Sequence, residues 1–237
     1  MKAIILAAGV GSRLGKPFPK CLSRLPYGEM ILGRQIRILR ECGINEIIVV
    51  VGFKKEFIME YFPGVLYKYN PLFYITNTAK SLLCAVEDLD DDILWMNGDV
   101  VFDKQVLKLL VKNKGNAVAV NSAHCGEEEV KYRADKNGFL LEISKQVANP
   151  QGEAVGINRV SREDLISFKK ALQEAADEDY FEKGIELMLE RGKRFKVVNI
   201  SEYRCIEVDF PADWEVAVSL FSEPPAAATE ESNEQNE

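Results

Sequence analysis

The fold of this chain is decided by residues 6–20, which read Leu-Ala-Ala-Gly-Val-Gly-Ser-Arg-Leu-Gly-Lys-Pro-Phe-Pro-Lys. Directly before them, the short apolar run Lys2–Leu6 is typical of an interior strand of a parallel sheet. Gly9 and Gly11 lack a Cβ atom, so the backbone there can adopt positive φ and point N–H groups at an anion. The sequence therefore predicts a strand that runs into a phosphate-binding loop.

Basic side chains follow the two glycines at three positions, Arg13, Lys16 and Lys20. Guanidinium and ammonium groups bind phosphate oxygens, so this segment can hold a triphosphate. Two better-known phosphate loops are excluded by their spacing. The dinucleotide fingerprint needs a glycine where Leu14 stands, and the Walker loop needs Ser or Thr where Pro17 stands.

The chain has 237 residues, of which 47% are hydrophobic, and this is enough for a substantial core. The sequence contains no internal repeat and no linker before Ser222, so we expect residues 1–222 to form a single domain. The last fifteen residues, 223–237, hold five acids and neither a base nor a large apolar side chain. We expect them to form a disordered acidic tail.

The formal net charge is −7, and most of it lies in that tail, so the rest of the chain is close to neutral. This balance argues against general nucleic-acid binding. No apolar run approaches the roughly 18 residues that span a bilayer, and the N-terminus lacks a signal-peptide cleavage site. We therefore expect a cytoplasmic protein without a membrane partner. The five cysteines are scattered, and we expect small buried side chains rather than disulfides or a zinc site.

Alternating strand and helix patterns run from the N-terminus to residue 121 and predict an α/β fold with a doubly wound, mainly parallel, Rossmann-like sheet. The expected strands are 2–6, 46–51, 66–69, 93–101 and 116–121, and the expected helices are 30–42, 54–61, 76–85 and 104–112. An antiparallel hairpin over 130–143 then begins a smaller antiparallel part. Beyond it we expect a strand at 152–156, helices at 161–176 and 180–191, strands at 195–200 and 205–209, and a closing helix. A capping-box variant, Ser161–Asp164, begins the first of these later helices.

The run Leu6–Arg13, together with Pro19-Lys20, resembles the opening motif of the nucleotidyltransferase superfamily, which has a GT-A-like fold. The resemblance covers nearly all of residues 1–215 and is nearest to bacterial phosphocholine cytidylyltransferases and aminoethylphosphonate cytidylyltransferases. It implies that Arg13 and Lys20 are catalytic and stabilise the triphosphate and the leaving pyrophosphate. It also implies that the loop contacts the nucleotide through Leu6, Ala7, Ala8, Gly9, Gly11 and Ser12.

Residues 76–85 open a helix with Asn and Thr at its N-terminus, a pattern that capping alone would explain. In the cytidylyltransferases that the chain resembles, this segment lies along the base and the ribose. The resemblance therefore makes Asn77, Thr78 and Ser81 candidate nucleotide contacts. Amide and hydroxyl groups suit the edge of a pyrimidine.

The dipeptide Gly98-Asp99 interrupts a predicted central strand near its carboxyl end, where open α/β sheets bind their ligands. A turn aspartate that bonds its own backbone is the plain alternative. The resemblance implies that Asp99 binds a metal and that Asp209, in the run Glu207–Asp213, is the second metal ligand. Since Mg2+ usually binds one or two carboxylates together with phosphate oxygens, we expect Mg2+ as the cofactor.

Three residues are candidates for the acceptor side of the site. The resemblance places Lys145 where it would hold the acceptor phosphate, and it places Glu153 on the strand that lines the acceptor site. A solvated lysine and a structural role for Glu153 are the alternatives. Glu182 lies in the first turn of its helix and could meet a cationic headgroup, although the helix dipole alone favours an acid there.

Together these residues imply a Mg2+-dependent cytidylyltransferase that moves CMP from CTP to a small phosphorylated or phosphonate acceptor and releases pyrophosphate. An acceptor oxygen that is already negative needs no general base, and the single histidine of the chain, His124, has no assigned role. The acceptor stays open between phosphocholine, phosphoethanolamine and 2-aminoethylphosphonate.

Two other functions remain as alternatives, a sugar-1-phosphate nucleotidyltransferase and a nucleotide-binding module without turnover. A glycosyltransferase would need an Asp-x-Asp metal motif, which Asn97-Gly-Asp99 does not supply. The sequence does not decide between a monomer and a homodimer.

Overall fold

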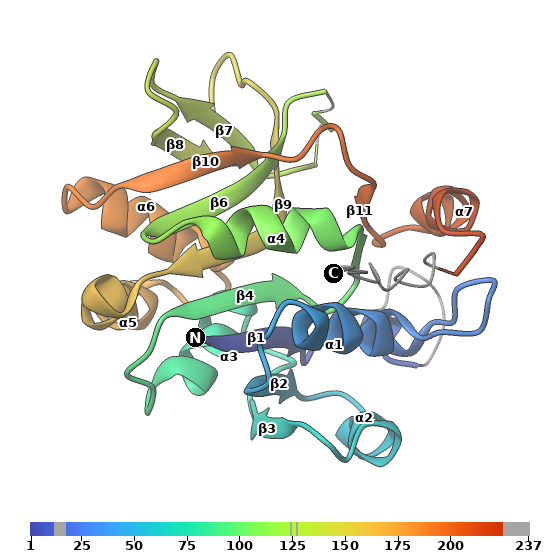
Figure 1. Cartoon of the computed structure of the whole chain (residues 1–237). Coiled ribbons are helices and arrows are strands. Elements are labelled where there is room, and N and C mark those ends of the chain that lie inside the picture. Colours follow the sequence, from blue (N-terminus) through green and yellow to red (C-terminus); the bar gives the residue numbers. More distant parts are fainter. Residues whose placement is uncertain (12–17, 124, 127, 225–237) are drawn as a thin grey trace, which may run out of the picture.

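The computed structural model describes residues 1–11, 18–123, 125–126 and 128–224. Its main feature is a nine-stranded sheet (Figure 1). Seven strands lie in the order β10-β6-β9-β4-β1-β2-β3, and the other two, β7 and β8, form a hairpin that is joined through β9. The strands are β1 (Lys2–Ala7), β2 (Ile47–Val51), β3 (Leu66–Tyr69), β4 (Ile93–Asn97), β6 (Asn116–Asn121), β7 (Lys131–Ala134), β8 (Leu140–Ser144), β9 (Glu153–Val160) and β10 (Phe195–Asn199). A separate two-stranded sheet pairs β5 (Val100–Phe102) with β11 (Cys205–Glu207).

The helices lie on both faces of the large sheet (Figure 1). They are α1 (Ile31–Glu41), α2 (Lys55–Tyr61), α3 (Thr78–Val86), α4 (Lys104–Lys112), α5 (Arg162–Glu174), α6 (Glu182–Glu190) and α7 (Pro211–Leu220), with a 3-10 turn, η2, at Lys20–Leu22. α1, α2 and α4 pack on one face, and α3, α5 and α6 pack on the other. None of these helices is long and apolar enough to cross a membrane.

β1 shows why the sequence selects this layering. Ala3 and Ile5 point into the core on one face of the sheet, and Ile4 and Leu6 point into the core on the other. Because helices cover both faces, every position after Lys2 must be apolar, which gives the continuous apolar run seen in the sequence.

The first half of the sheet is parallel, as predicted: β1 pairs with β2 and β4, and β2 pairs with β3. β9 differs from the prediction. It was expected as a short strand over 152–156 at the acceptor site, but it spans eight residues and runs antiparallel between β4 and β6. An apolar run shows that a strand is buried but not which neighbours it pairs with, so its central position could not be predicted.

The expected capping box of α5 was wrong. The Ser161 side chain makes no capping hydrogen bond. Instead the Arg162 N–H donates to Oδ1 of Asp92 at 2.8 Å, and the Ser161 N–H donates to Oδ1 of Asn116 at 2.9 Å. Side chains from neighbouring elements therefore satisfy this helix end, which a local motif cannot reveal.

The cysteines agree with the prediction only in part. All five are free thiols, as expected. Cys21 alone among them is buried, whereas Cys42, Cys84 and Cys205 are half-buried and Cys125 is exposed. The prediction of small buried side chains therefore holds for Cys21 and was wrong for Cys125, which lies in the loop that follows β6.

Candidate active site

The loop after β1 and the turn after β4 meet at the carboxyl ends of two adjacent parallel strands. The Gly98 N–H donates to the Leu6 carbonyl at 2.9 Å, and a Cβ atom on Gly98 would lie 2.8 Å from the same oxygen. Only glycine lets the two segments approach this closely. Asp99, the next residue, is thereby held beside the start of the glycine loop.

The two loop glycines have different conformations. Gly11 uses the positive φ that a glycine allows, with a φ of +62°, whereas Gly9 stays outside the left-handed region. A Cβ atom on Gly11 would lie 2.8 Å from Cγ of Lys20, which shows that the lysine side chain packs directly against the loop. Ser12 and Arg13 lie outside the described residues.

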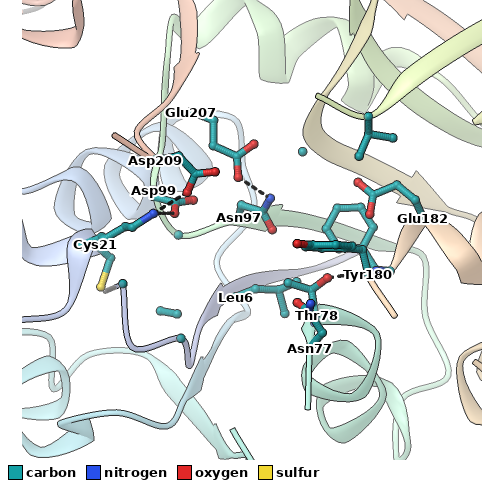
Figure 2. A pocket seen from close by; sticks show the side chains of 18 of the residues that line it. Leu6, Cys21, Asn77, Thr78, Asn97, Asp99, Tyr180, Glu182, Glu207 and Asp209 are labelled. Carbon is teal, nitrogen blue, oxygen red and sulfur yellow. Dashed lines mark hydrogen bonds and ion pairs between the residues drawn. The ribbon is translucent and has the colours of Figure 1, made fainter. Parts of the chain in front are cut away.

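Lys20 brings together the two predicted metal ligands. It begins η2, and its Nζ atom lies 2.5 Å from Oδ1 of Asp209 and 3.3 Å from Oδ2 of Asp99. Figure 2 shows the Asp99 and Asp209 carboxylates close together on one side of the pocket. The structure therefore joins residues from three distant parts of the sequence into one charged group.

Asp209 reaches this group because β11 pairs with β5. The Val208 N–H donates to the Asp99 carbonyl at 3.1 Å. This hydrogen bond holds the next residue, Asp209, close to Asp99. Beyond them, the N–H groups of Asp209 and Phe210 donate to Oδ2 of Asp213 at 3.0 and 2.6 Å, and α7 begins. The run Glu207–Asp213 thus contains both the site carboxylate and the side chain that positions its backbone.

The charged group consists of two carboxylates, Asp99 and Asp209, around the Lys20 ammonium. Burial and the neighbouring Asp209 carboxylate raise the pKa of Asp99, while the Lys20 ammonium opposes them. Burial lowers the pKa of Lys20, but the two carboxylates outweigh this effect and raise it above its ordinary value. The pair Asp99 and Asp209 is therefore a place where positive charge is favoured.

The same pair fits a divalent cation. No group of three or more His, Cys, Asp or Glu side chains suited to a metal occurs in the part of the chain that the structure describes. A metal at Asp99 and Asp209 would need further ligands besides the carboxylates of the described residues. Mg2+ commonly takes such a site, since it binds one or two carboxylates, phosphate oxygens and waters.

The N-terminus of α3 forms another wall of the pocket. Oδ1 of Asn77 accepts the Thr78 N–H at 2.8 Å, so Asn77 is the helix cap that its sequence pattern indicates. Its Nδ2 atom donates to the Glu178 carbonyl at 3.1 Å, and Oγ1 of Thr78 accepts the Phe181 N–H at 3.0 Å. Both side chains line the pocket and also tie α3 to the segment before α6.

Three predicted contacts do not line the pocket in the described structure. Ser81 is buried, and its hydroxyl accepts a hydrogen bond from Nδ2 of Asn70 at 3.0 Å. Ala8 is buried and does not line the pocket, whereas Leu6 and Ala7 from the same segment do. The Glu153 carboxylate accepts the Gly126 N–H at 3.1 Å, which supports the structural alternative for that residue.

Lys145 and Glu182, the two remaining residues predicted for the acceptor, both line the pocket. Nζ of Lys145 lies 5.1 Å from the centre of the Tyr180 ring, within the range of a cation–π contact. Glu182, the first residue of α6, is only 7% exposed. Burial raises the pKa of its carboxyl to about 7, and the Lys145 ammonium partly opposes the shift.

The glycine loop, Lys20 with its two aspartates, the N-terminus of α3, Lys145 and Glu182 border one pocket of about 360 Å3, a size common for small-molecule sites. A family model for the MobA-like NTP transferase domain matches residues 3–183, which is well over half of the chain. The chain belongs to the MobA-like NTP transferases. The predicted nucleotidyltransferase family is therefore confirmed.

Two relatives resemble this NTP transferase over most of its length. The CMP-5'-(3-aminopropyl)phosphonate synthase of Streptomyces rubellomurinus is 31% identical over 94% of the chain, but the chain spans only 39% of that enzyme. The CTP:phosphoglutamine cytidylyltransferase of Campylobacter jejuni is 29% identical over 92% of the chain, which covers 99% of that enzyme.

The fold of the NTP transferase also matches a solved structure. The CTP:phosphocholine cytidylyltransferase of Streptococcus pneumoniae aligns with a TM-score of 0.76 at 20% identity, covering 92% of this chain and 97% of that one. This likeness confirms the predicted α/β fold.

The pocket of the NTP transferase includes residues to which the sequence analysis assigned no role. Nδ2 of Asn97 donates to Oε1 of Glu207 at 2.9 Å, and Glu128 and Glu129 approach from the loop before β7. Burial and the carboxylates of Asp99 and Asp209 raise the pKa of Glu207 well above its ordinary value. Glu207 lies two residues before Asp209, which was a usable signal, whereas an acidic loop at 128–129 resembles any solvated loop.

Proposed function

We propose that this chain transfers a cytidylyl group from CTP to a small phosphorylated or phosphonate acceptor and releases pyrophosphate. The observation that carries the proposal is the position of Lys20 Nζ between Asp99 and Asp209, in the same pocket as the glycine loop and Thr78. A metal–triphosphate complex requires charges of both signs at one place. The names of the two relatives, one acting on CTP and one making a CMP product, support cytidine as the base.

The nucleotide side of the reaction is assigned to the loop and its basic residues. The backbone at Gly9 and Gly11 is proposed to meet the phosphates, with Asn77 and Thr78 beside the base and ribose. Lys20 is proposed to stabilise the charge that grows on the leaving pyrophosphate, together with the basic residues that follow Gly11 in the sequence. Mg2+ bound at the two aspartates would neutralise part of the triphosphate charge.

The acceptor side needs an anchor but no base. Lys145 is proposed to hold the anionic end of the acceptor against the α-phosphorus. An acceptor oxygen attacks that phosphorus, a new P–O bond forms while the bond to the β-phosphate breaks, and pyrophosphate leaves with the electron pair. The attacking oxygen is already negative, so no proton has to be removed.

The proposal is tested by measuring pyrophosphate release with Mg2+ and either CTP or UTP. The acceptors are phosphoethanolamine, 2-aminoethylphosphonate, phosphocholine and glucose 1-phosphate. We expect release only when CTP and a small acceptor are both present, and we expect EDTA to stop it until Mg2+ is restored. Release with UTP and glucose 1-phosphate alone would instead identify a sugar nucleotidyltransferase. If no combination of nucleotide and acceptor releases pyrophosphate, the result would favour a nucleotide-binding module without turnover.

A further inference from the structure

The lining of the pocket includes a buried carboxylate, one of whose oxygens has no hydrogen-bond partner among the described residues. Glu182 is 7% exposed, and its Oε2 atom has no hydrogen-bond partner among the described residues. Figure 2 shows its carboxylate pointing into the pocket, across from Asp99 and Asp209. A buried anion in this state is costly unless a cation or a hydrogen-bond donor completes the site.

The fold holds this carboxylate in place rather than letting it turn to solvent. The segment before α6 is attached to α3, because the Phe181 N–H donates to Oγ1 of Thr78 at 3.0 Å. The Phe181 ring is buried and packs edge-on against Trp95, with the ring centres 5.7 Å apart. Glu182 therefore starts its helix from a rigid support, and its side chain is preorganised for a ligand.

Nearby charges make this part of the pocket strongly negative. Glu207 lines the same pocket and is oriented by the hydrogen bond from Asn97, and Glu129 lines it as well. In the described lining, Lys20 already lies between two aspartates and Lys145 lies over the Tyr180 ring. The Lys145 ammonium offsets part of the rise in the pKa of Glu182, but neither of these two described lysines forms an ion pair with it.

From this arrangement we infer that Glu182 binds a primary ammonium group of the acceptor. The inference rests on the proposed function, in which Lys145 holds the anionic end of the same molecule. The pocket then complements a zwitterion, with a phosphate or phosphonate at one end and an amine at the other.

A primary ammonium fits better than a quaternary one for two reasons. It carries three N–H donors, which can supply the hydrogen bond that Oε2 of Glu182 lacks, whereas a trimethylammonium has none. A quaternary ammonium is instead recognised by a cage of aromatic faces. The three described aromatic residues of the lining do not form one near Glu182. Phe181 is buried against Trp95, the Tyr180 ring lies beneath Lys145, and Phe210 directly follows Asp209, across the pocket.

The decisive experiment compares acceptors that share an anionic end and differ at the nitrogen. Phosphoethanolamine, its N-methylated forms up to phosphocholine, and ethyl phosphate are each assayed with CTP and Mg2+ in the full-length wild-type protein. We expect kcat/KM to fall with each methyl group, to at least about tenfold lower for phosphocholine, because N–H donors to a carboxylate are lost.

The variant Glu182→Gln keeps the shape of the side chain and removes its charge. We expect it to raise KM for phosphoethanolamine about 10- to 100-fold while KM for CTP and kcat/KM for ethyl phosphate stay unchanged. Glu190→Gln is the matched control, because Glu190 is an exposed acid at the end of the same helix and does not line the pocket. It should behave as the wild type with every acceptor.

The outcomes separate this inference from the proposed function. Turnover with phosphocholine as fast as with phosphoethanolamine overturns the inference and leaves cytidylyl transfer standing, as does an equal effect of Glu182→Gln on all acceptors. No pyrophosphate release with any acceptor overturns both. If Glu182→Gln does not fold, the wild-type acceptor series alone decides.

Discussion

The Lys20 ammonium lies 2.5 Å from the Asp209 carboxylate, although 189 positions separate the two residues in the sequence. One residue belongs to the loop after the first strand, and the other precedes the last helix. Because the contact joins both ends of the fold, the charged centre of the pocket forms only when the whole domain has folded.

Removing the Lys20 charge is expected to affect both chemistry and stability. In Lys20→Met the carboxylates of Asp99 and Asp209 face each other without the ammonium between them. We expect kcat to fall by a factor of at least about 10^2 and the free energy of unfolding to fall by about 3 kcal/mol, as for other broken buried ion pairs. Pyrophosphate release and urea denaturation measure the two effects.

A double variant separates these effects. Adding Asp209→Asn to Lys20→Met removes one of the repelling charges, so stability should recover by about 1 kcal/mol or more while turnover stays lost. Near-normal turnover in either variant would contradict the assigned roles. A stability loss without recovery would mean that repulsion between the carboxylates is not its cause.

Glu182 is expected to make stability depend on pH. Burial raises the pKa of its carboxyl in the folded protein to about 7, from an ordinary value of 4.5. Between these values the folded state binds more protons than the unfolded state, so stability falls as the pH rises through this window, by up to roughly 3 kcal/mol. Glu182→Gln has no carboxyl at this position, so its stability should not fall in this way as the pH rises.

The measurement is urea denaturation of both proteins from pH 4.5 to 8. The free energy of unfolding of Glu182→Gln, relative to the wild type, should increase with pH and level off above about pH 7. A difference that does not change with pH would show that the Glu182 carboxyl ionises normally in the folded protein.

Gly98 is expected to tolerate no side chain. In Gly98→Ala the new Cβ atom would lie 2.8 Å from the Leu6 carbonyl oxygen, which belongs to rigid backbone. We expect a loss of about 1–3 kcal/mol in stability and a lower kcat, because Asp99 moves with its neighbour. Gly115→Ala is the control, since nothing lies within 4 Å of a Cβ there, and it should be as stable as the wild type. Equal stability of the two variants would contradict the close approach.

Lys80 is expected to stabilise the end of a neighbouring helix. Its Nζ atom donates to the carbonyls of Leu172, Gln173 and Ala175 at 3.3, 3.1 and 2.6 Å, where α5 ends. Lys80→Met keeps the apolar stem and loses these bonds, so thermal or urea unfolding should show a loss of about 1–3 kcal/mol. Lys170→Met, an exposed lysine on α5, should cost little. A similar loss in both variants would point to a general charge effect.

Much of the fold could be predicted because its signals are local. Apolar runs identified β1, β2 and β4, and the helical spacing of apolar residues before Gly43 identified α1. Gly43 follows the end of that helix with a φ of +82°. The glycine loop and Gly98-Asp99 follow strands at the same sheet edge. Their meeting could therefore be expected from topology alone.

The rest depends on contacts between distant segments. Two predicted site residues, Ser81 and Glu153, lie outside the pocket. The Ser81 hydroxyl accepts a hydrogen bond from Asn70, and the Glu153 carboxylate accepts one from the Gly126 N–H, and the sequence could show neither contact. Glu182 has the same local pattern as any acid in a first helical turn. Its burial follows from the packing of Phe181 against Trp95, which no short motif encodes.

The antiparallel course of β9 also sets an order of assembly during synthesis. β6 leaves the ribosome before β9, and its other neighbour, β10, comes later still, so β6 has no partner strand in the sheet until β9 emerges. Until then β4 presents an open edge, of the kind that invites pairing with other chains. The parallel strands β1, β2 and β4 beside the glycine loop can pair early, whereas α6, which begins at Glu182, is added afterwards. A nascent chain interrupted between these events would hold half of a substrate site and an exposed strand edge.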